Sequence, residues 1–86
     1  SVWWEENVVS LTATEFAMLA QLMKHPKKVF SRDAIMQGSY QYNVYVSDRT
    51  IDSHIKKIRK KLAEALPDQD LIHSVYGVGY KFEQNG

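Results

Sequence analysis

The sequence predicts an α+β fold in which three helices lie between a short N-terminal antiparallel sheet and a C-terminal β-hairpin. Three observations support it: a helix-capping signature at Thr12, an amphipathic pattern over residues 47–66, and two runs of strand-forming residues around a turn at Gly77. The chain has 86 residues and no cysteine, so we expect one small core, one domain over residues 1–86, and neither disulfide nor thiol chemistry. Its apolar runs are only a few residues long, which predicts no membrane span and a cytoplasmic location.

The N-terminal elements are a pair of strands and a capped helix. Residues 1–10 are rich in Trp and Val around a polar interruption, which predicts two strands joined by a turn. Thr12 and Glu15 then form a capping box, in which the Thr12 hydroxyl and the Glu15 carboxylate each accept from the other residue's backbone amide. The apolar residues that follow at helical spacing are Phe16, Leu19, Ala20 and Met23, and Pro26 ends the helix.

The second half of the chain contains two further helices and a hairpin. After a connector over residues 26–30, Ser31 is an N-cap candidate for a short helix that stops near Gly38. Residues 39–46 alternate polar and apolar side chains and predict an ordered loop. A third helix starts at Ser47 or Asp48 and runs to about residue 66, and residues 71–83 form the hairpin.

The third helix has two different faces. At about 100° per residue, one narrow stripe is apolar and belongs in the core: Ile51, Ile55, Ile58 and Leu62. The opposite face carries cations and a short hydroxyl: Arg49, Ser53, Lys56 and Lys60. Thr50, Lys57 and Lys61 flank that face on one side, and His54 lies nearer the apolar stripe. This helix therefore presents a basic surface to solvent.

The net charge of the chain is concentrated on this helix. Residues 48–61 hold six basic and two acidic residues, a net charge of +4 within a chain total of +1, so the rest of the chain sums to −3. A polyanion such as double-stranded DNA would meet this segment first. The helix dipole also favours acids at a helix start and bases at its end, so a plain solvated helix is the alternative. The hairpin that follows favours DNA binding, because helix plus hairpin fits a major groove and its adjacent backbone.

Other kinds of site find little support. The three histidines lack metal-ligand spacing, so no metal is expected. The turn at Gly77 and Gly79 precedes a strand and lacks the third glycine of a nucleotide-binding loop, so no cofactor is expected. The carboxylates are scattered at capping or flanking positions, which gives no acid/base pair and predicts that the domain is not an enzyme.

Three segments together carry a family likeness. In order, LTATEFAMLAQLMKHPKKVFSRDAIM, NVYVSDRTIDSHIKKIRKKL and VYGVGYKF resemble the winged-helix effector domain of OmpR/PhoB-type two-component response regulators, which are bacterial phosphorelay proteins. The resemblance implies a winged helix-turn-helix fold and sequence-specific binding of double-stranded DNA. It places the third helix in the major groove and the hairpin wing on the adjacent backbone or minor groove. It also implies binding to tandem half-sites as two copies, and a receiver domain elsewhere in the full-length protein.

The resemblance assigns roles to particular residues. Phosphates would be met by Arg49, Lys56, Lys60 or Lys61, and bases by Ser53 and Lys57 with Thr50 in support. His54 falls beside the DNA backbone, and Ser74 and Tyr76 fall in the wing. The loop before the third helix matches a segment that touches RNA polymerase; its residues are Tyr40, Gln41, Tyr42, Asn43, Val44 and Tyr45.

The sequence also departs from the family pattern. Tyr76 stands where many members have an arginine, and a phenol lacks the charge that favours a narrow minor groove. Lys57 replaces a common arginine and cannot form its two-pronged contact with guanine. Tyr40 replaces a frequent tryptophan, and two N-terminal strands are expected where the family usually has four. These differences predict a weaker wing contact and softer base selectivity.

Two alternatives to this function stay open. The same fold could serve as a protein-interaction module that uses the aromatic loop and the third helix. It could also be the effector domain of a membrane-anchored one-component regulator, which only flanking sequence would distinguish.

Overall fold

A computed structural model describes residues 2–4, 7–40 and 45–84, with side chains described from Val9 onward. The elements in chain order are β1 (Val2–Trp4), β2 (Asn7–Val9), α1 (Ala13–Lys24), β3 (Phe30–Ser31), α2 (Arg32–Ser39), α3 (Asp48–Ala65), β4 (Ile72–Val75) and β5 (Gly79–Phe82). The predicted α+β winged-helix architecture is confirmed, with β1 and β2 as the short N-terminal sheet. None of the helices in these ranges is long and apolar enough to cross a membrane.

Helix α1 begins at the predicted capping box. The Glu15 amide donates to Thr12 Oγ1 over 3.1 Å, and the Thr12 amide donates to Glu15 Oε1 over 2.9 Å. Of the apolar residues at helical spacing, Leu19 is buried and Ala20 and Met23 are half-buried, whereas Phe16 is 44% exposed. Met18 and Leu22 complete the buried face. This face packs on both α2 and α3.

The wing sheet contains a strand that the sequence did not reveal. Residues 26–30 were expected to form only a connector, yet Phe30 begins β3, which pairs with β5 in a three-stranded antiparallel sheet of order β3-β5-β4. A two-residue strand has too little alternation to be recognised. The pairing needs Gly79, since a Cβ at that position would lie 1.9 Å from the Phe30 carbonyl oxygen.

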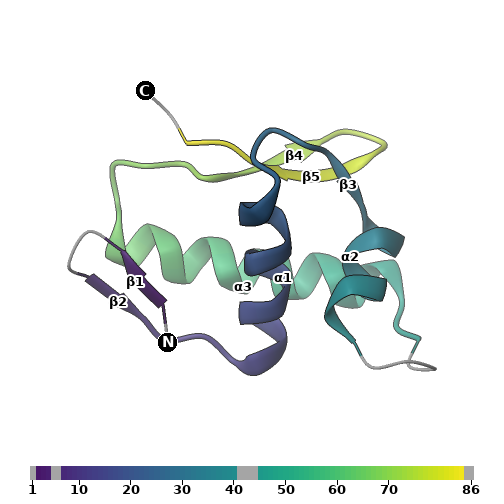
Figure 1. Cartoon of the computed structure of the whole chain (residues 1–86), viewed down its shortest axis with the longest axis horizontal. Helices are drawn as coiled ribbons and strands as arrows, with labels where there is room; N and C mark the ends of the chain where they lie inside the picture. Colours follow the sequence, from purple (N-terminus) through teal and green to yellow (C-terminus); the bar gives the residue numbers. More distant parts are fainter. Residues whose placement is uncertain (1, 5–6, 41–44, 85–86) are drawn as a thin grey trace.

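Helix α3 is the long element around which the domain is built. Ser47 is its N-cap, and its predicted apolar stripe is buried at Ile51, Ile55, Ile58 and Leu62. In Figure 1, α1 crosses in front of α3, α2 lies beside the first half of α3, and the wing sheet runs along one side. The β1–β2 hairpin lies near the other end of α3, against which β2 packs. The side of α3 turned away from this core is therefore left to solvent.

Candidate nucleic-acid interface

The solvent side of α3 is basic along most of its length. Five of its exposed side chains form what we call the basic face: Arg49, Ser53, Lys56, Lys57 and Lys60. Of the carboxylates of α3, Asp48 and Glu64 are exposed at its two ends, and the half-exposed Asp52 borders this face beside Lys56 and is paired with Arg32. A surface of this kind attracts a polyanion. It also presents hydrogen-bond donors along a helix that the major groove of DNA can admit.

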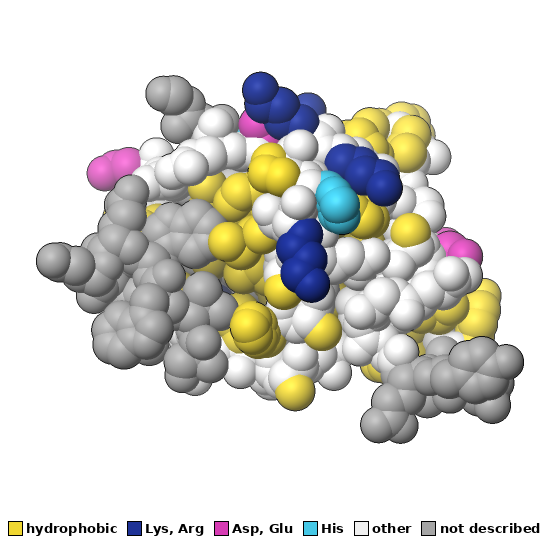
Figure 2. Space-filling view, viewed as in Figure 1, with side chains coloured by type: hydrophobic (Ala, Val, Ile, Leu, Met, Phe, Trp, Pro, Cys, Tyr) yellow, Lys and Arg dark blue, Asp and Glu magenta, His cyan; other side chains and the backbone are white. Residues whose placement is uncertain are grey.

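The face of the molecule over α1 has a different character. In the space-filling view of Figure 2, its Lys and Arg side chains are few and lie apart, with hydrophobic surface between them. On α1 itself, the large apolar side chain of Phe16 is 44% exposed. Of the eleven Lys and Arg residues of the chain, six lie on α3.

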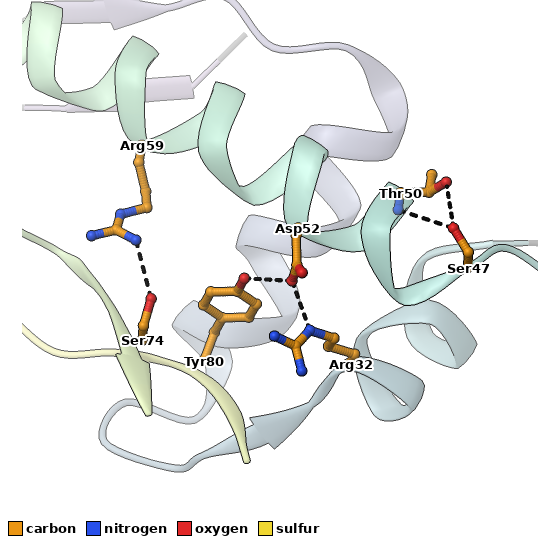
Figure 3. A network of polar contacts seen from close by, with 7 residues as sticks. All are labelled: Arg32, Ser47, Thr50, Asp52, Arg59, Ser74 and Tyr80. Carbon is orange, nitrogen blue, oxygen red and sulfur yellow. Dashed lines mark hydrogen bonds and ion pairs between the residues drawn. The ribbon is translucent and has the colours of Figure 1, made fainter. Parts of the chain in front are cut away.

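The N-terminus of α3 is held by hydroxyl groups. Ser47 Oγ accepts from the Thr50 amide over 3.3 Å and lies 3.2 Å from the Thr50 hydroxyl (Figure 3). Thr50 is half-buried and engaged in this cap, so its hydroxyl does not point freely from the helix. The positive end of the helix dipole adds to the field of Arg49 beside it.

The wing, residues 72–82, projects next to α3. Its turn contains Gly77 at φ 75°, and at the tip the Tyr76 side chain is fully exposed and Val78 is 51% exposed. Ser74 lies on β4 and accepts a hydrogen bond of 3.2 Å from Nη1 of Arg59 (Figure 3). Arg59 is exposed but was not among the predicted contacts, because it lies to one side of the basic face. It connects that face to the wing.

Two predicted DNA contacts are engaged within the protein. The Lys61 ammonium lies 2.6 Å from Oε1 of Glu15, whose side chain is 2% exposed. Burial raises the pKa of Glu15, but the hydrogen bonds and charge of Lys61 and the Thr12 amide outweigh it and hold the pKa below its ordinary value. His54 is half-buried with its ring 6.3 Å from that of Tyr40. Lys61 therefore stabilises the junction of α1 and α3 and is left out of the DNA contacts proposed below.

A polar cluster between α3 and the wing escaped the sequence analysis. Asp52 Oδ1 accepts from Nε of Arg32 over 2.7 Å and from the Tyr80 hydroxyl over 2.5 Å (Figure 3). Burial raises the pKa of Asp52, but the hydrogen bonds from Arg32 and Tyr80 and the charge of Arg32 outweigh it and hold the pKa below its ordinary value, so the carboxylate stays charged. Burial and Asp52 together raise the pKa of Tyr80, which keeps its proton. The sequence signal that could have pointed to this cluster was the presence of an acidic residue, Asp52, on an otherwise basic helix.

The loop before α3 is only partly described. Tyr40 is half-buried and packs against the core, and burial raises the pKa of its phenol. Tyr45 is 80% exposed. The remaining predicted polymerase-facing residues, Gln41, Tyr42, Asn43 and Val44, lie outside the described residues.

These features define a winged-helix domain of the DNA-binding type: α3 is an exposed basic helix, α2 lies beside it, and the β4–β5 hairpin has an exposed tip. Sequence comparison agrees, since residues 5–82 match the family described as "Transcriptional regulatory protein, C terminal". The chain belongs to this family, and its resemblance to the effector domains of OmpR/PhoB-type response regulators is confirmed.

The chain is also similar to individual curated proteins of this family. It is 45% identical over 80 residues to the transcriptional regulatory protein BaeR of Escherichia coli, which covers 93% of this chain and 33% of BaeR. The chain thus spans about a third of the length of the curated relatives it matches.

Solved structures of DNA complexes share the fold. The DNA-binding domain of the response regulator AdeR, crystallised with an intercistronic region, has a TM-score of 0.78 and 36% identity, over 87% of this chain and 74% of AdeR's. The Klebsiella pneumoniae RstA DNA-binding domain, crystallised with its RstA box, has a TM-score of 0.70 and 31% identity, over the same shares of 87% and 74%.

Proposed function

We propose that this chain binds double-stranded DNA in a sequence-specific manner and acts as the output domain of a two-component response regulator. The observation that carries this proposal is the basic face of α3, which has no carboxylate within it and lies next to a wing with an exposed tip. Such a surface supports binding rather than catalysis, and we assign the chain no enzymatic activity.

The basic face divides into groups that hold the backbone and groups that read bases. Arg49, Lys56 and Lys60 are proposed to meet phosphates, because cations on long side chains neutralise the backbone without regard to sequence. Ser53 on this face and Lys57 at its flank are both exposed and are proposed to meet base edges in the major groove. Thr50 and His54, both half-buried, are supporting contacts at its border.

The wing supplies a second contact surface. Ser74 and Tyr76 are proposed to meet the adjacent backbone, with Arg59 between them and the basic face. An open hollow of about 340 Å³ lies between α3 and β5 and is lined by Asp52, Ile55, Lys56, Arg59 and Tyr80. Lys56 and Arg59 are proposed to meet a backbone phosphate at this hollow, where the charge of Asp52 is compensated by Arg32.

Partners beyond DNA follow from the same assignment. We propose a receiver domain in the full-length protein, binding of two copies to tandem half-sites, and a cytoplasmic location with the bacterial chromosome. Among the described loop residues, Tyr45 is the proposed contact for RNA polymerase, because it is exposed whereas Tyr40 packs inward.

A salt titration of the isolated domain tests the main proposal. DNA fragments selected on the purified protein supply the duplex, and affinity is measured at several salt concentrations by fluorescence anisotropy. If four to six phosphates are neutralised, log K falls against log salt with a slope of roughly −4 to −5. A salt-independent affinity, or equal affinity for every duplex even at low salt, contradicts the proposal and favours a protein-interaction module.

A matched pair of variants locates the surface. Lys56→Gln removes one charge from the basic face, and Lys24→Gln removes one from the exposed end of α1. The first variant is expected to lower the slope by about one unit and the second to leave it unchanged. An equal effect of both would show attraction without a defined interface.

A further inference from the structure

Asp52 joins three elements that surround the proposed DNA-binding surface. Its Oδ1 atom accepts hydrogen bonds from Arg32, the first residue of α2, and from Tyr80 on β5. The Arg32 guanidinium also lies 5.9 Å from the centre of the Tyr80 ring. One carboxylate on α3 therefore connects α2, α3 and the wing sheet, as the close view in Figure 3 shows.

A carboxylate at this position would repel DNA unless its charge were compensated. Asp52 is half-exposed, with 41% of its side chain accessible, and it lines the hollow between α3 and β5 together with Lys56 and Arg59. A negative charge beside a phosphate backbone is repulsive. The Arg32 charge, 2.7 Å away, compensates it, so the pair places little net charge toward the duplex.

The cluster also lies where the wing meets the helix. Tyr80 is 8% exposed, so its ring belongs to the core while its hydroxyl reaches Asp52. Along α3, the hydrogen bond from Arg59 to Ser74 forms a second connection to the wing, but both of its partners are exposed. The Asp52 cluster is the more buried of these two connections. It is therefore the better able to hold the wing at a fixed angle to α3.

We propose that Asp52 is a positioning residue for DNA recognition: with Arg32 and Tyr80 it fixes the wing relative to α3, so that both contact one duplex at the same time. This inference rests on the proposed function. When the wing is held fixed relative to α3, both surfaces bind one duplex with no further loss of conformational entropy. A loosely attached wing must be ordered on binding, so its effective concentration at the duplex is lower. Asp52 acts through the wing and touches no base or phosphate itself.

The test measures coupling between the two surfaces rather than affinity alone. The duplex selected on the protein is compared with one shortened by the base pairs that the wing protects in a hydroxyl-radical footprint. The loss of affinity on shortening is measured for the unchanged protein and for Tyr80→Phe, which keeps the buried ring and removes only the hydroxyl. Asp52→Asn is the second variant, and all measurements are made at a temperature where thermal unfolding shows each protein folded.

The proposal predicts that shortening the duplex costs the unchanged protein more than either variant, by about threefold or more. Glu83→Gln is the matched control, because it removes an ion pair of 3.1 Å with Lys81 of β5 that involves no residue of α3. It is expected to lose as much as the unchanged protein. Equal losses for Tyr80→Phe, Asp52→Asn and the unchanged protein would overturn the positioning role, as would no loss at all on shortening. Failure of the unchanged protein to bind any duplex would instead overturn the proposed function.

Discussion

The side-chain nitrogen of Lys61 lies 2.6 Å from Oε1 of Glu15 and joins the C-terminal half of α3 to the first turn of α1. Glu15 is almost fully buried, and the same oxygen accepts from the Thr12 amide of the capping box. A single carboxylate thus completes a helix cap and a contact between two helices. The ion pair has consequences for stability that separate Lys61 from its exposed neighbours.

Replacement of Lys61 by methionine is expected to destabilise the fold. The variant keeps the length of the side chain but leaves the Glu15 charge without its partner, at a cost of about 1–3 kcal/mol in the free energy of unfolding. Urea denaturation measures this cost. The double variant Lys61→Met/Glu15→Gln is expected to regain part of it, because no unpaired buried charge remains. If the double variant lost the sum of the unfolding free energies that Lys61→Met and Glu15→Gln lose singly, the pairing would be contradicted.

Stability is expected to fall in acid because of two carboxylates. The pKa of Glu15 lies below its ordinary value of 4.5, and that of Asp52 lies below its ordinary value of 3.8. Their stabilisation is complete above those ordinary values and is lost as the pH falls through the lower folded values, since the unfolded chain binds protons first. Urea denaturation at decreasing pH should therefore show a decline that begins below about pH 5. Glu15→Gln should make this decline shallower, and an unchanged decline would contradict the role of Glu15.

Gly79→Ala is expected to disrupt the wing sheet. An alanine Cβ would lie 1.9 Å from the Phe30 carbonyl oxygen, so β3 and β5 could not keep their pairing, at a cost of about 2–3 kcal/mol. Gly77→Ala is the comparison, because it meets no atom within 4 Å and is opposed only by its φ of 75°. That variant should cost about 1 kcal/mol. Thermal unfolding of both variants checks the order, and a reversed order would contradict the close approach at Gly79.

Lys57 and Lys60 are expected to differ in what they contribute to DNA binding. Lys57→Ala should reduce the preference for the selected site over unrelated duplexes by about fivefold to tenfold, because a base contact is lost. Lys60→Ala should weaken binding to all duplexes by one factor and lower the salt slope by about one unit. Competition titrations with both kinds of duplex measure the two effects. Equal losses on every sequence for both variants would contradict the division of roles.

Much of the architecture could be predicted from short stretches of the chain. The capping box at Thr12, the N-cap at Ser31 and the apolar stripe of α3 are local signals, and each element appeared where its signal placed it. The strand β3 could not be predicted, because two residues have no detectable alternation and gain their strand geometry from pairing with β5. The spacing of apolar residues in α1 did not single out Met18 and Leu22, which are fully buried where α1 packs on α2 and α3.

The candidate site was only partly accessible to the same reasoning. The helical positions of Lys56, Lys57 and Lys60 were sufficient to put them on an exposed face, and all three are exposed. Lys61 follows directly in the sequence, yet its partner Glu15 is 46 residues away. The contacts of Asp52 with Arg32 and Tyr80 span 20 and 28 residues.

By itself, the sequence determined the order of the helices and hairpins, the apolar and basic sides of α3, and the likeness to a family of DNA-binding effector domains. These properties depend on caps and periodic patterns within one element, so a few consecutive residues are sufficient to set them. The tertiary structure alone decided which cations remain free and how the wing is held against α3. Lys60 and Lys61 are adjacent and carry the same charge, but only packing of α1 against α3 brings Glu15 to one of them and leaves the other exposed.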